Sequence, residues 1–277
     1  MSSGVVDLQR ALAMAMAALA MAGLALSCEP TVVIGACDEP SNAGAGAASA
    51  AMASTDDAVD MPWSTSFEDG LCGYHSVGGF CYARHGASLK VVESPSRLTG
   101  KFAVAFSVDA DASTALERSQ ARCVIQGAMP KSAYYGAWYF IPALATSDGN
   151  WNLFHFLGGV SEADSHPLWD VSLINRADGK LKLSVLNFLT GKYPAIADDL
   201  EAVPIGRWFR LQIKLVRSAQ NAGEVIVLQD GVVALHLTDL ITDDTTWGQW
   251  YVGNYVRALV PASSTVYVDD ITISEQP

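Results

Sequence analysis

Residues 205–231 read IGRWFRLQIKLVRSAQNAGEVIVLQDG, and this stretch decides the fold. Apolar residues at 209, 211, 213 and 215 alternate with Arg210, Gln212 and Lys214, which is the period of a half-buried β-strand. A short polar turn, a second apolar alternation and an Asp-Gly turn follow. We therefore predict an antiparallel hairpin here.

Further strands of the same kind are expected throughout residues 63–277. Alternating apolar and polar residues are interrupted there by Gly, Pro, Asn and Asp, and the Asp-Gly pairs at 178–179 and 230–231 are strong hairpin signals. No long stretch beyond the N-terminal leader has a helical period. Many closely spaced strands predict an all-β protein with an antiparallel β-sandwich or jelly roll.

The chain is acidic. Of its 277 residues, 29 are acidic and 17 are basic, which gives a formal net charge of −12. Nucleic acids and anionic membranes require basic patches, so no nucleic-acid partner is expected. Neutral or cationic ligands and calcium suit this charge, whereas an acidic polymer would need a local basic groove.

The leader predicts export. Residues 11–27 are small or apolar, and such a run is too short for a membrane span of about 20 residues but typical of a signal peptide. The run ends in LALSC at 24–28, which resembles the lipobox of bacterial lipoproteins. The resemblance implies a signal peptide at 1–27, a lipid on Cys28 and a cell-envelope location with a membrane anchor. Ordinary cleavage, with Cys28 as a spare thiol, is the alternative.

Residues 28–62 are expected to form a flexible linker, because 38–60 are mostly Ala, Gly, Ser and acidic residues. None of the five cysteines forms a C-x-x-C pair, which argues against zinc ribbons and redox sites. In an exported protein, Cys72 and Cys81 are expected to close a local disulfide. A pairing of Cys37 with Cys123 stays open.

Four segments resemble the concanavalin A-like jelly-roll superfamily, with its laminin-G-like and polysaccharide-lyase branches. They are SFEDG at 66–70, GAWYFIP at 136–142, IGRWFRL at 205–211 and TVYVDDI at 265–271. The resemblance covers residues 64–274. It implies a β jelly-roll domain at 63–277 with one concave sheet, where aromatic and polar side chains bind sugars.

The candidate residues for such a groove lie on several predicted strands. Alternation places Arg210, Gln212 and Lys214 on one face, but it leaves open whether that face belongs to the concave sheet or is ordinary solvated surface. The expected substrate-binding and catalytic side chains are Arg122, Gln126, Trp151, His155, Asp170, Arg210, Tyr251 and Tyr255.

Three of these segments also resemble alginate-lyase-like jelly rolls. They are RSQAR at 118–122, LFH at 153–155 and YVGNY at 251–255. Elimination beside a uronate carboxylate needs a group that neutralises the carboxylate, a base and an acid, and the resemblance implies Arg122, His155 and Tyr255 for these roles. The chain departs from the family pattern because Leu153 replaces a Gln and no Lys lies between the tyrosines.

A metal site is expected at the two ends of the domain. In many carbohydrate-binding jelly rolls an acidic residue of the first strand and an Asp-Asp pair of the last strand hold a structural calcium. Glu68, Asp269 and Asp270 match these positions, and hard oxygen ligands suit calcium. An acidic cluster without an ion is the alternative.

These observations favour a non-catalytic, carbohydrate-binding or adhesive jelly-roll domain displayed as a bacterial lipoprotein. A polysaccharide lyase cleaving an acidic glycan by β-elimination is the second hypothesis, and a structural envelope protein without a sugar ligand is the third. Retaining glycoside hydrolysis is not expected, because the chain lacks the Glu-x-Asp-x-Glu strand that would place two carboxylates across a groove.

Overall fold

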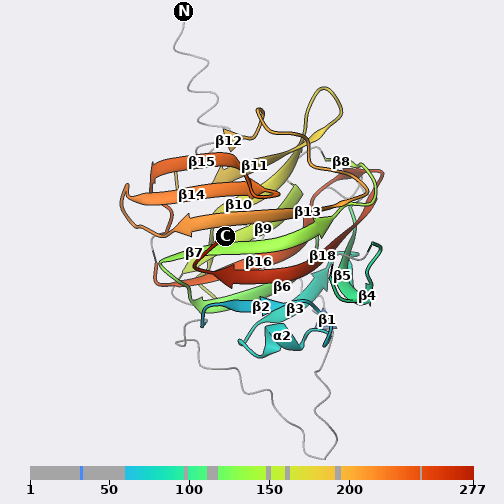
Figure 1. Cartoon of the computed structure of the whole chain (residues 1–277), viewed down its shortest axis with the longest axis horizontal. Coiled ribbons are helices and arrows are strands. Elements are labelled where there is room, and N and C mark those ends of the chain that lie inside the picture. The colour runs from blue at the N-terminus through green and yellow to red at the C-terminus, as the bar shows by residue number, and fades with distance from the viewer. Residues whose placement is uncertain are drawn as a thin grey trace, which may run out of the picture. The chain divides into compact units, whose positions relative to one another are not determined.

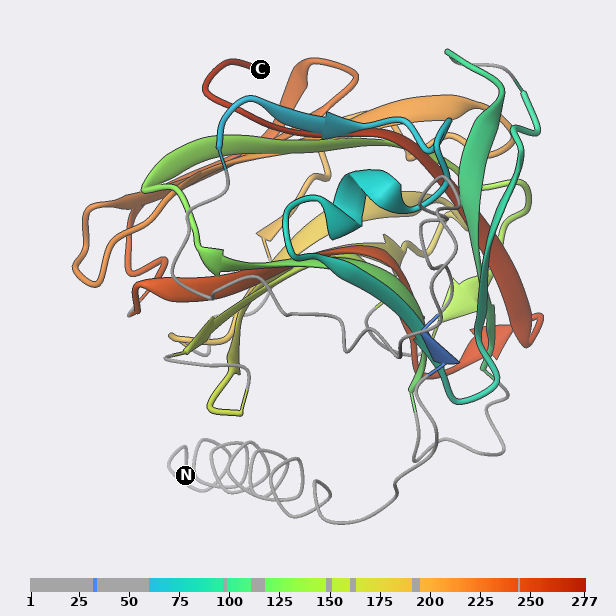
Figure 2. The ribbon, with the colours of Figure 1, turned by 90° about the horizontal axis from the view of Figure 1, so that it is seen from below.

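Two antiparallel β-sheets make up most of the described chain in the computed structural model (Figure 1). The structure describes residues 32–33, 60–96, 99–110, 118–147, 151–159, 163–190, 195–243 and 245–277. Figure 2 shows the two sheets edge-on as two stacked layers. The predicted all-β antiparallel sandwich is therefore confirmed.

Sheet A carries most of the predicted site residues. In spatial order it contains β1 (Val32–Val33), β3 (Phe80–Arg84), β6 (Ser119–Ala128), β16 (Trp247–Val256), β9 (Trp151–Gly159), β10 (His166–Asn175), β11 (Leu181–Asn187) and β12 (Ala195–Ile196). Its central strands come from distant parts of the chain, so their register brings together residues that are far apart in sequence.

Sheet B forms the other layer. Its order is β15 (Val232–Leu240), β14 (Gly223–Gln229), β13 (Trp208–Val216), β7 (Ser132–Phe140), β18 (Ser263–Ser274), β5 (Phe102–Asp109) and β4 (Ser88–Glu93). The short strand β2 (Trp63–Thr65) also pairs with β18, while β8 (Thr146–Ser147) pairs with β17 (Leu259–Val260). Every strand pair in the two sheets is antiparallel.

The hairpin predicted at 205–231 is present as β13 and β14. These strands pair from Leu211 opposite Gln229 to Val216 opposite Glu224. Asp230 and Gly231 then turn the chain into β15 with φ angles of 53° and 79°, the positive values that a tight two-residue hairpin turn requires.

The core lies between the two sheets. The apolar residues of β13 at 209, 211, 213 and 215 belong to it and are at most 2% exposed. Arg210, Gln212 and Lys214 therefore lie on the outer face of sheet B. The two layers are also linked by a buried hydrogen bond of 2.9 Å, which Tyr139 of β7 donates from its hydroxyl to the carbonyl of Leu153 in β9.

The disulfide prediction is wrong. Cys81 bonds to Cys123, because β3 and β6 pair with these two residues directly opposite each other and both side chains are buried in the core. Cys72, in the short helix α2 (Cys72–His75), is also disulfide-bonded, but not to Cys81. A bond between Cys37 and Cys123 is excluded, because Cys123 is already bonded to Cys81.

Two further features concern the ends of the sandwich. Helix α2 contacts β2, β3 and β6 and buries Tyr74 in the core between the layers (Figure 2). Val32 and Val33, expected in the linker, pair with β3 at the edge of sheet A. Within the described ranges, no helix has both the length and the apolar character needed to cross a membrane.

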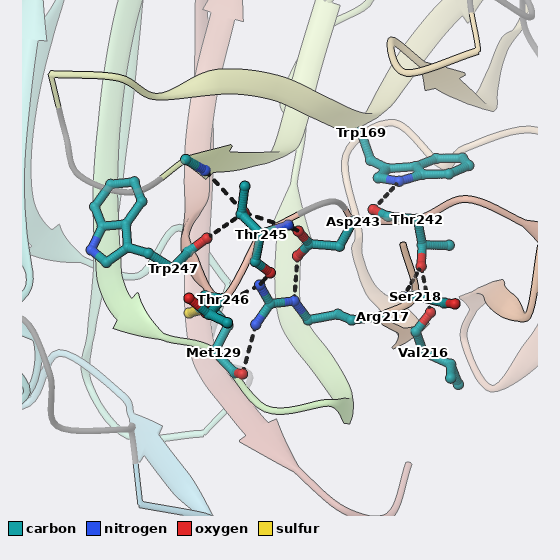
Figure 3. Close-up of polar contacts among 11 residues, drawn as sticks. Met129, Trp169, Val216, Arg217, Ser218, Thr242, Asp243, Thr245, Thr246 and Trp247 are labelled. Atoms are coloured by element: carbon teal, nitrogen blue, oxygen red, sulfur yellow. Dashed lines mark hydrogen bonds and ion pairs between the residues drawn. The ribbon is translucent and has the colours of Figure 1, made fainter. Parts of the chain in front are cut away.

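A buried arginine ties sheet B to sheet A. Arg217 follows β13 and forms an ion pair with Asp243, and its guanidinium also donates to the carbonyls of Met129 at 2.7 Å and Thr245 at 2.9 Å (Figure 3). Asp243 Oδ1 accepts the backbone N–H of Thr245 at 2.7 Å. The Arg217 and Asp243 side chains are only 8% and 5% exposed, so each charge depends on the other.

Candidate active site

Four of the predicted site residues share the outer face of sheet A, the face turned away from the core. Arg122 lies between core-facing neighbours in β6, and His155 lies between Phe154 and Phe156 of the core in β9. Tyr251 and Tyr255 alternate with core residues of β16 in the same way. The strand period therefore points all four side chains to one side.

The register of β16 brings these four side chains together. Tyr251 lies directly opposite His155 on one neighbouring strand, and Gly253 lies opposite Arg122 on the other. The Arg122 guanidinium carbon is 5.0 Å from the ring centroid of Tyr251 and 3.8 Å from that of Tyr255. The rings of His155 and Tyr251 are 5.5 Å apart. This arrangement is a continuous cluster of one cation, one imidazole and two phenols.

Gly253 makes this close approach possible. A Cβ atom added at Gly253 would lie 2.2 Å from the carbonyl oxygen of Ala121 and 2.8 Å from Cα of Arg122. No side chain fits between the two strands at this point. Arg122 can therefore contact the tyrosines on both sides of the glycine.

The two tyrosine hydroxyls have different hydrogen-bond partners. Tyr251 donates its proton to Gln249 Oε1, and Gln249 in turn donates to Gln126 Oε1 at 2.8 Å. Tyr255 instead accepts a hydrogen bond of 3.0 Å from the guanidinium of Arg118. The Tyr251 proton is therefore used in a hydrogen bond to Gln249. Tyr255 acts as the acceptor in its bond with Arg118, so that bond does not use the Tyr255 proton.

Asp170 lies behind the imidazole rather than in contact with a ligand. It is directly opposite His155 in the β9–β10 pairing, is 1% exposed, and contacts His155 Nδ1 through Oδ1. Its other oxygen accepts a 2.8 Å hydrogen bond from Asn152. The prediction that Asp170 binds sugar directly is therefore wrong, because its side chain is buried between His155 and Asn152.

Trp151 is also not on this face. Phe154 pairs with Val171 and Asn152 pairs with Ser172, which leaves Leu153 as an extra residue in β9. This bulge shifts the alternation by one, so Asn152 joins His155 on the outer face and Trp151 enters the core with 0% exposure. Trp151 donates its indole N–H to Asn254 at 2.8 Å and cannot stack on a sugar.

Arg210 does not lie on the sheet that carries Arg122 and His155. It is in β13 of sheet B, where Phe209 and Leu211 face the core, so its side chain points outward from the opposite layer. Its backbone N–H donates to Asp230 at 2.8 Å. The structure therefore places Arg210 on the outer face of sheet B, where it is half-buried and its neighbour on that face, Gln212, is 1% exposed.

The acidic residues expected to bind calcium are close enough to influence one another. Glu68 Oε1 accepts the backbone N–H groups of Lys101 and Phe102 at 2.7 and 2.8 Å, which lowers its pKa. Burial, and then the nearby charges of Asp270 and Glu68, raise the pKa of Asp269 to about 7. Asp269 Oδ2 is buried without a hydrogen-bond partner. In the described residues, however, no three His, Cys, Asp or Glu side chains lie together as a ready-made metal site.

Two residues that the sequence patterns do not single out also belong to the site. Arg118, at the start of the RSQAR segment, donates to Tyr255, and its role depends on the pairing of β6 with β16. Asn152 reaches the site only because of the bulge at Leu153. Two surface cavities of about 270 and 550 Å³ share none of their lining residues with this cluster.

Cys28, the expected lipidation site, lies outside the described residues.

Comparison with known proteins shows the fold. No protein-family model and no curated protein matches the sequence. An endo-β-1,4-glucuronan lyase from the fungus Trichoderma reesei superposes with a TM-score of 0.55 at 15% identity, over 70% of this chain and 90% of that one. The alginate lyase Aly36B gives 0.54 at 9% identity, over 78% and 97%. An alginate lyase from Aplysia kurodai gives 0.51 at 11%, over 77% and 98%. The chain has the β-sandwich fold of these polysaccharide lyases.

Proposed function

We propose that this protein is a polysaccharide lyase that cleaves an acidic glycan by β-elimination. The observation that carries the proposal is the convergence of Arg122, His155 and Tyr255 on one face of sheet A. The fold of known lyases supports it, since the solved neighbours act on glucuronan and alginate. We favour this hypothesis over the non-catalytic one because Tyr251 links the His155 ring to Arg122, and Arg122 in turn contacts Tyr255.

The reaction needs three groups at once. The Arg122 guanidinium neutralises the uronate carboxylate, which makes the proton on the adjacent carbon more acidic. His155 removes that proton, the C–H electron pair forms a C=C bond, and the glycosidic C–O bond at the next carbon breaks. Tyr255 gives its proton to the departing oxygen. One product carries an unsaturated uronate and the other a free hydroxyl.

Tyr255 suits the role of the acid better than Tyr251. The hydroxyl of Tyr251 already donates to Gln249, so its proton is engaged within the protein. The oxygen of Tyr255 accepts from Arg118, and its own proton remains available for a leaving group. The positive charge of Arg118 also stabilises negative charge on that oxygen after proton transfer.

The substrate class follows from the local charge. Arg118 and Arg122 both contact Tyr255, so two guanidinium groups meet at this point in a chain whose formal net charge is −12. Such a local concentration of cations favours an anionic ligand. Guanidinium also binds carboxylate with two parallel hydrogen bonds, which suits a uronate better than a neutral sugar.

The test is the appearance of unsaturated product. Purified protein is incubated with glucuronan, alginate and other acidic polysaccharides, and ultraviolet absorbance of the new C=C bond is followed. We expect activity from the wild type and its loss in His155→Ala and Tyr255→Phe. Arg210→Ala is the matched control for Arg122→Ala, because Arg210 is an arginine on the opposite sheet, and it should retain full activity.

The outcomes separate the three hypotheses. Retention on a glycan array without product from any substrate would overturn the lyase proposal in favour of a carbohydrate-binding domain. Absence of both binding and product would favour a structural role. Full activity in His155→Ala would show that elimination, if present, uses another base.

We also propose that the protein is exported and lipid-anchored through Cys28 in a bacterial cell envelope. The support is the leader and the LALSC segment at 24–28. The carbohydrate-active domain would then act next to a membrane, without inserting into it.

Calcium at the cluster of Glu68, Asp269 and Asp270 is a further proposal. Its support is the buried, unpartnered Oδ2 of Asp269, together with the burial and, after it, the neighbouring charges of Asp270 and Glu68 that raise the Asp269 pKa to about 7. Hard carboxylate oxygens are the ligands calcium prefers. Calcium should raise the melting temperature of the wild type at pH 8 and not that of Asp269→Asn. An equal effect on both proteins would contradict a site at Asp269.

A further inference from the structure

A buried chain of polar side chains stands behind His155. Asp170 Oδ1 contacts Nδ1 of His155, and Asp170 Oδ2 accepts from Asn152 Nδ2 at 2.8 Å. Asn152 Oδ1 accepts from Ser172 Oγ at 2.6 Å, and Ser184 Oγ donates to the Ser172 carbonyl at 3.3 Å. Asp170, Asn152, Ser172 and Ser184 are 1%, 3%, 2% and 6% exposed, so water does not compete for these bonds.

This chain fixes the orientation of the Asn152 amide. Because an ionised carboxylate can only accept, Asn152 must present its NH₂ group to Asp170, and its Oδ1 then accepts from the Ser172 hydroxyl. Asp170 therefore acts as an acceptor at Oδ2. An ionised carboxylate can only accept hydrogen bonds, so the proton in the Asp170–His155 contact lies on Nδ1 of the imidazole.

The position of that proton determines which ring nitrogen is basic. In a neutral imidazole one nitrogen carries the proton and the other carries the lone pair. With the proton on Nδ1, the lone pair is on Nε2, on the other side of the ring from Asp170. Edge-on contacts with Tyr251 at 5.5 Å and Phe188 at 6.3 Å restrict rotation of the ring.

We infer that Asp170, held by Asn152 and Ser172, is a positioning residue that selects the Nδ1–H tautomer of His155 and leaves Nε2 as the base. This inference rests on the proposed lyase function for the role of Nε2, but the tautomer itself is a property of the free protein. The titratable groups against the ring are Asp170 from β10 and Tyr251 from β16. The Arg122 charge, from β6, contacts the Tyr251 ring.

The first measurement is nitrogen NMR of the wild type at a pH where His155 is neutral. Long-range proton–nitrogen correlations distinguish a protonated Nδ1 from a protonated Nε2, and comparison with His155→Gln identifies the His155 signals. We expect protonated Nδ1. Protonated Nε2 in the wild type would overturn the inference without any need for an Asp170 variant.

The second measurement uses Asp170→Asn, which keeps the shape but can present an NH₂ group to Nδ1. We expect the tautomer to invert to Nε2–H and kcat to fall by about 10²–10⁴-fold with a smaller change in KM, as for other histidines whose carboxylate is replaced by an amide. Ser107→Ala is the control, since it removes a hydrogen bond of 2.8 Å with Thr265 in sheet B, away from His155. It should keep both the tautomer and kcat.

The two proposals can fail separately. An unchanged tautomer and unchanged kcat in a folded Asp170→Asn would overturn the role of Asp170. If the wild type cleaves no acidic glycan, the lyase proposal fails, while the NMR signals still decide whether Asp170 controls the His155 proton. An inverted tautomer with wild-type kcat would refute the use of Nε2 as the base.

Discussion

Replacing Arg217 by methionine should destabilise the fold strongly, because it leaves a buried charge without a partner. Asp243 has only 5% of its side chain exposed, and the Arg217 guanidinium is its ion-pair partner. Arg217 also satisfies the carbonyls of Met129 and Thr245, which no methionine side chain can do (Figure 3). The network joins the end of β13 to the segment before β16.

The expected magnitude follows from burial. Removing one partner of a buried ion pair costs about 3–5 kcal/mol, since the remaining charge is neither paired nor hydrated. For a domain of roughly 200 residues, about 1 kcal/mol lowers the melting temperature by about 2–4 °C, so a decrease of about 6–20 °C is expected. Calorimetry or urea unfolding with matched m-values measures this change.

Two further variants make this prediction sharp. Arg176 and Asp198 form an exposed ion pair at 3.1 Å with side chains 39% and 52% exposed, so Arg176→Met should cost less than about 1 kcal/mol. Adding Asp243→Asn to Arg217→Met removes the unpaired charge but keeps an acceptor for the backbone of Thr245, and should recover much of the loss. The reasoning is refuted if Arg217→Met is no more destabilising than Arg176→Met.

Three more predictions test other parts of the molecule. Gly253→Ala should lower kcat/KM by about 10²-fold, because a Cβ would lie 2.2 Å from a backbone oxygen and 2.8 Å from Cα of Arg122; unchanged kinetics would contradict this. The pKa of Asp269 is raised from 3.8 to about 7, so its charge destabilises the fold progressively as the pH rises between these values. With a chelator present, the melting temperature of the wild type should fall relative to that of Asp269→Asn as the pH rises through this range. Melting temperatures that change in parallel with pH would disprove the raised pKa of Asp269. Labelled palmitate should enter the wild type and not Cys28→Ser, whereas equal labelling would exclude Cys28 as the lipid site.

Local patterns are sufficient to predict the strands. Alternation along 207–216 and the Asp-Gly pair at 230–231 act over a few residues, and β13, β14 and their turns form where these signals predict them. The same alternation correctly groups Arg210, Gln212 and Lys214 on one face. Alternation cannot say which of the two sheets contains the strand. For Arg210, the sheet decides whether the side chain lies near Arg122 and His155 or on the opposite layer.

The site depends on contacts that no local pattern encodes. A single extra residue, Leu153, reverses the alternation in β9, placing Asn152 on the outer face of sheet A and Trp151 in the core. The Cys81–Cys123 bond depends on the pairing of β3 with β6, which brings together residues separated by 42 positions. A nearby cysteine such as Cys72 is closer in sequence but lies in α2 instead.

The sequence by itself determines an all-β sandwich, because strand period, turn residues and composition are properties of short segments. It also supplies the chemical groups, Arg122, His155 and Tyr255. Only the tertiary structure decides that these groups meet, since their contact requires the register of β6 and β9 on either side of β16. Asp170 lies opposite His155 for the same kind of reason, since the register of β9 and β10 brings its carboxylate to Nδ1 of the imidazole from a separate strand.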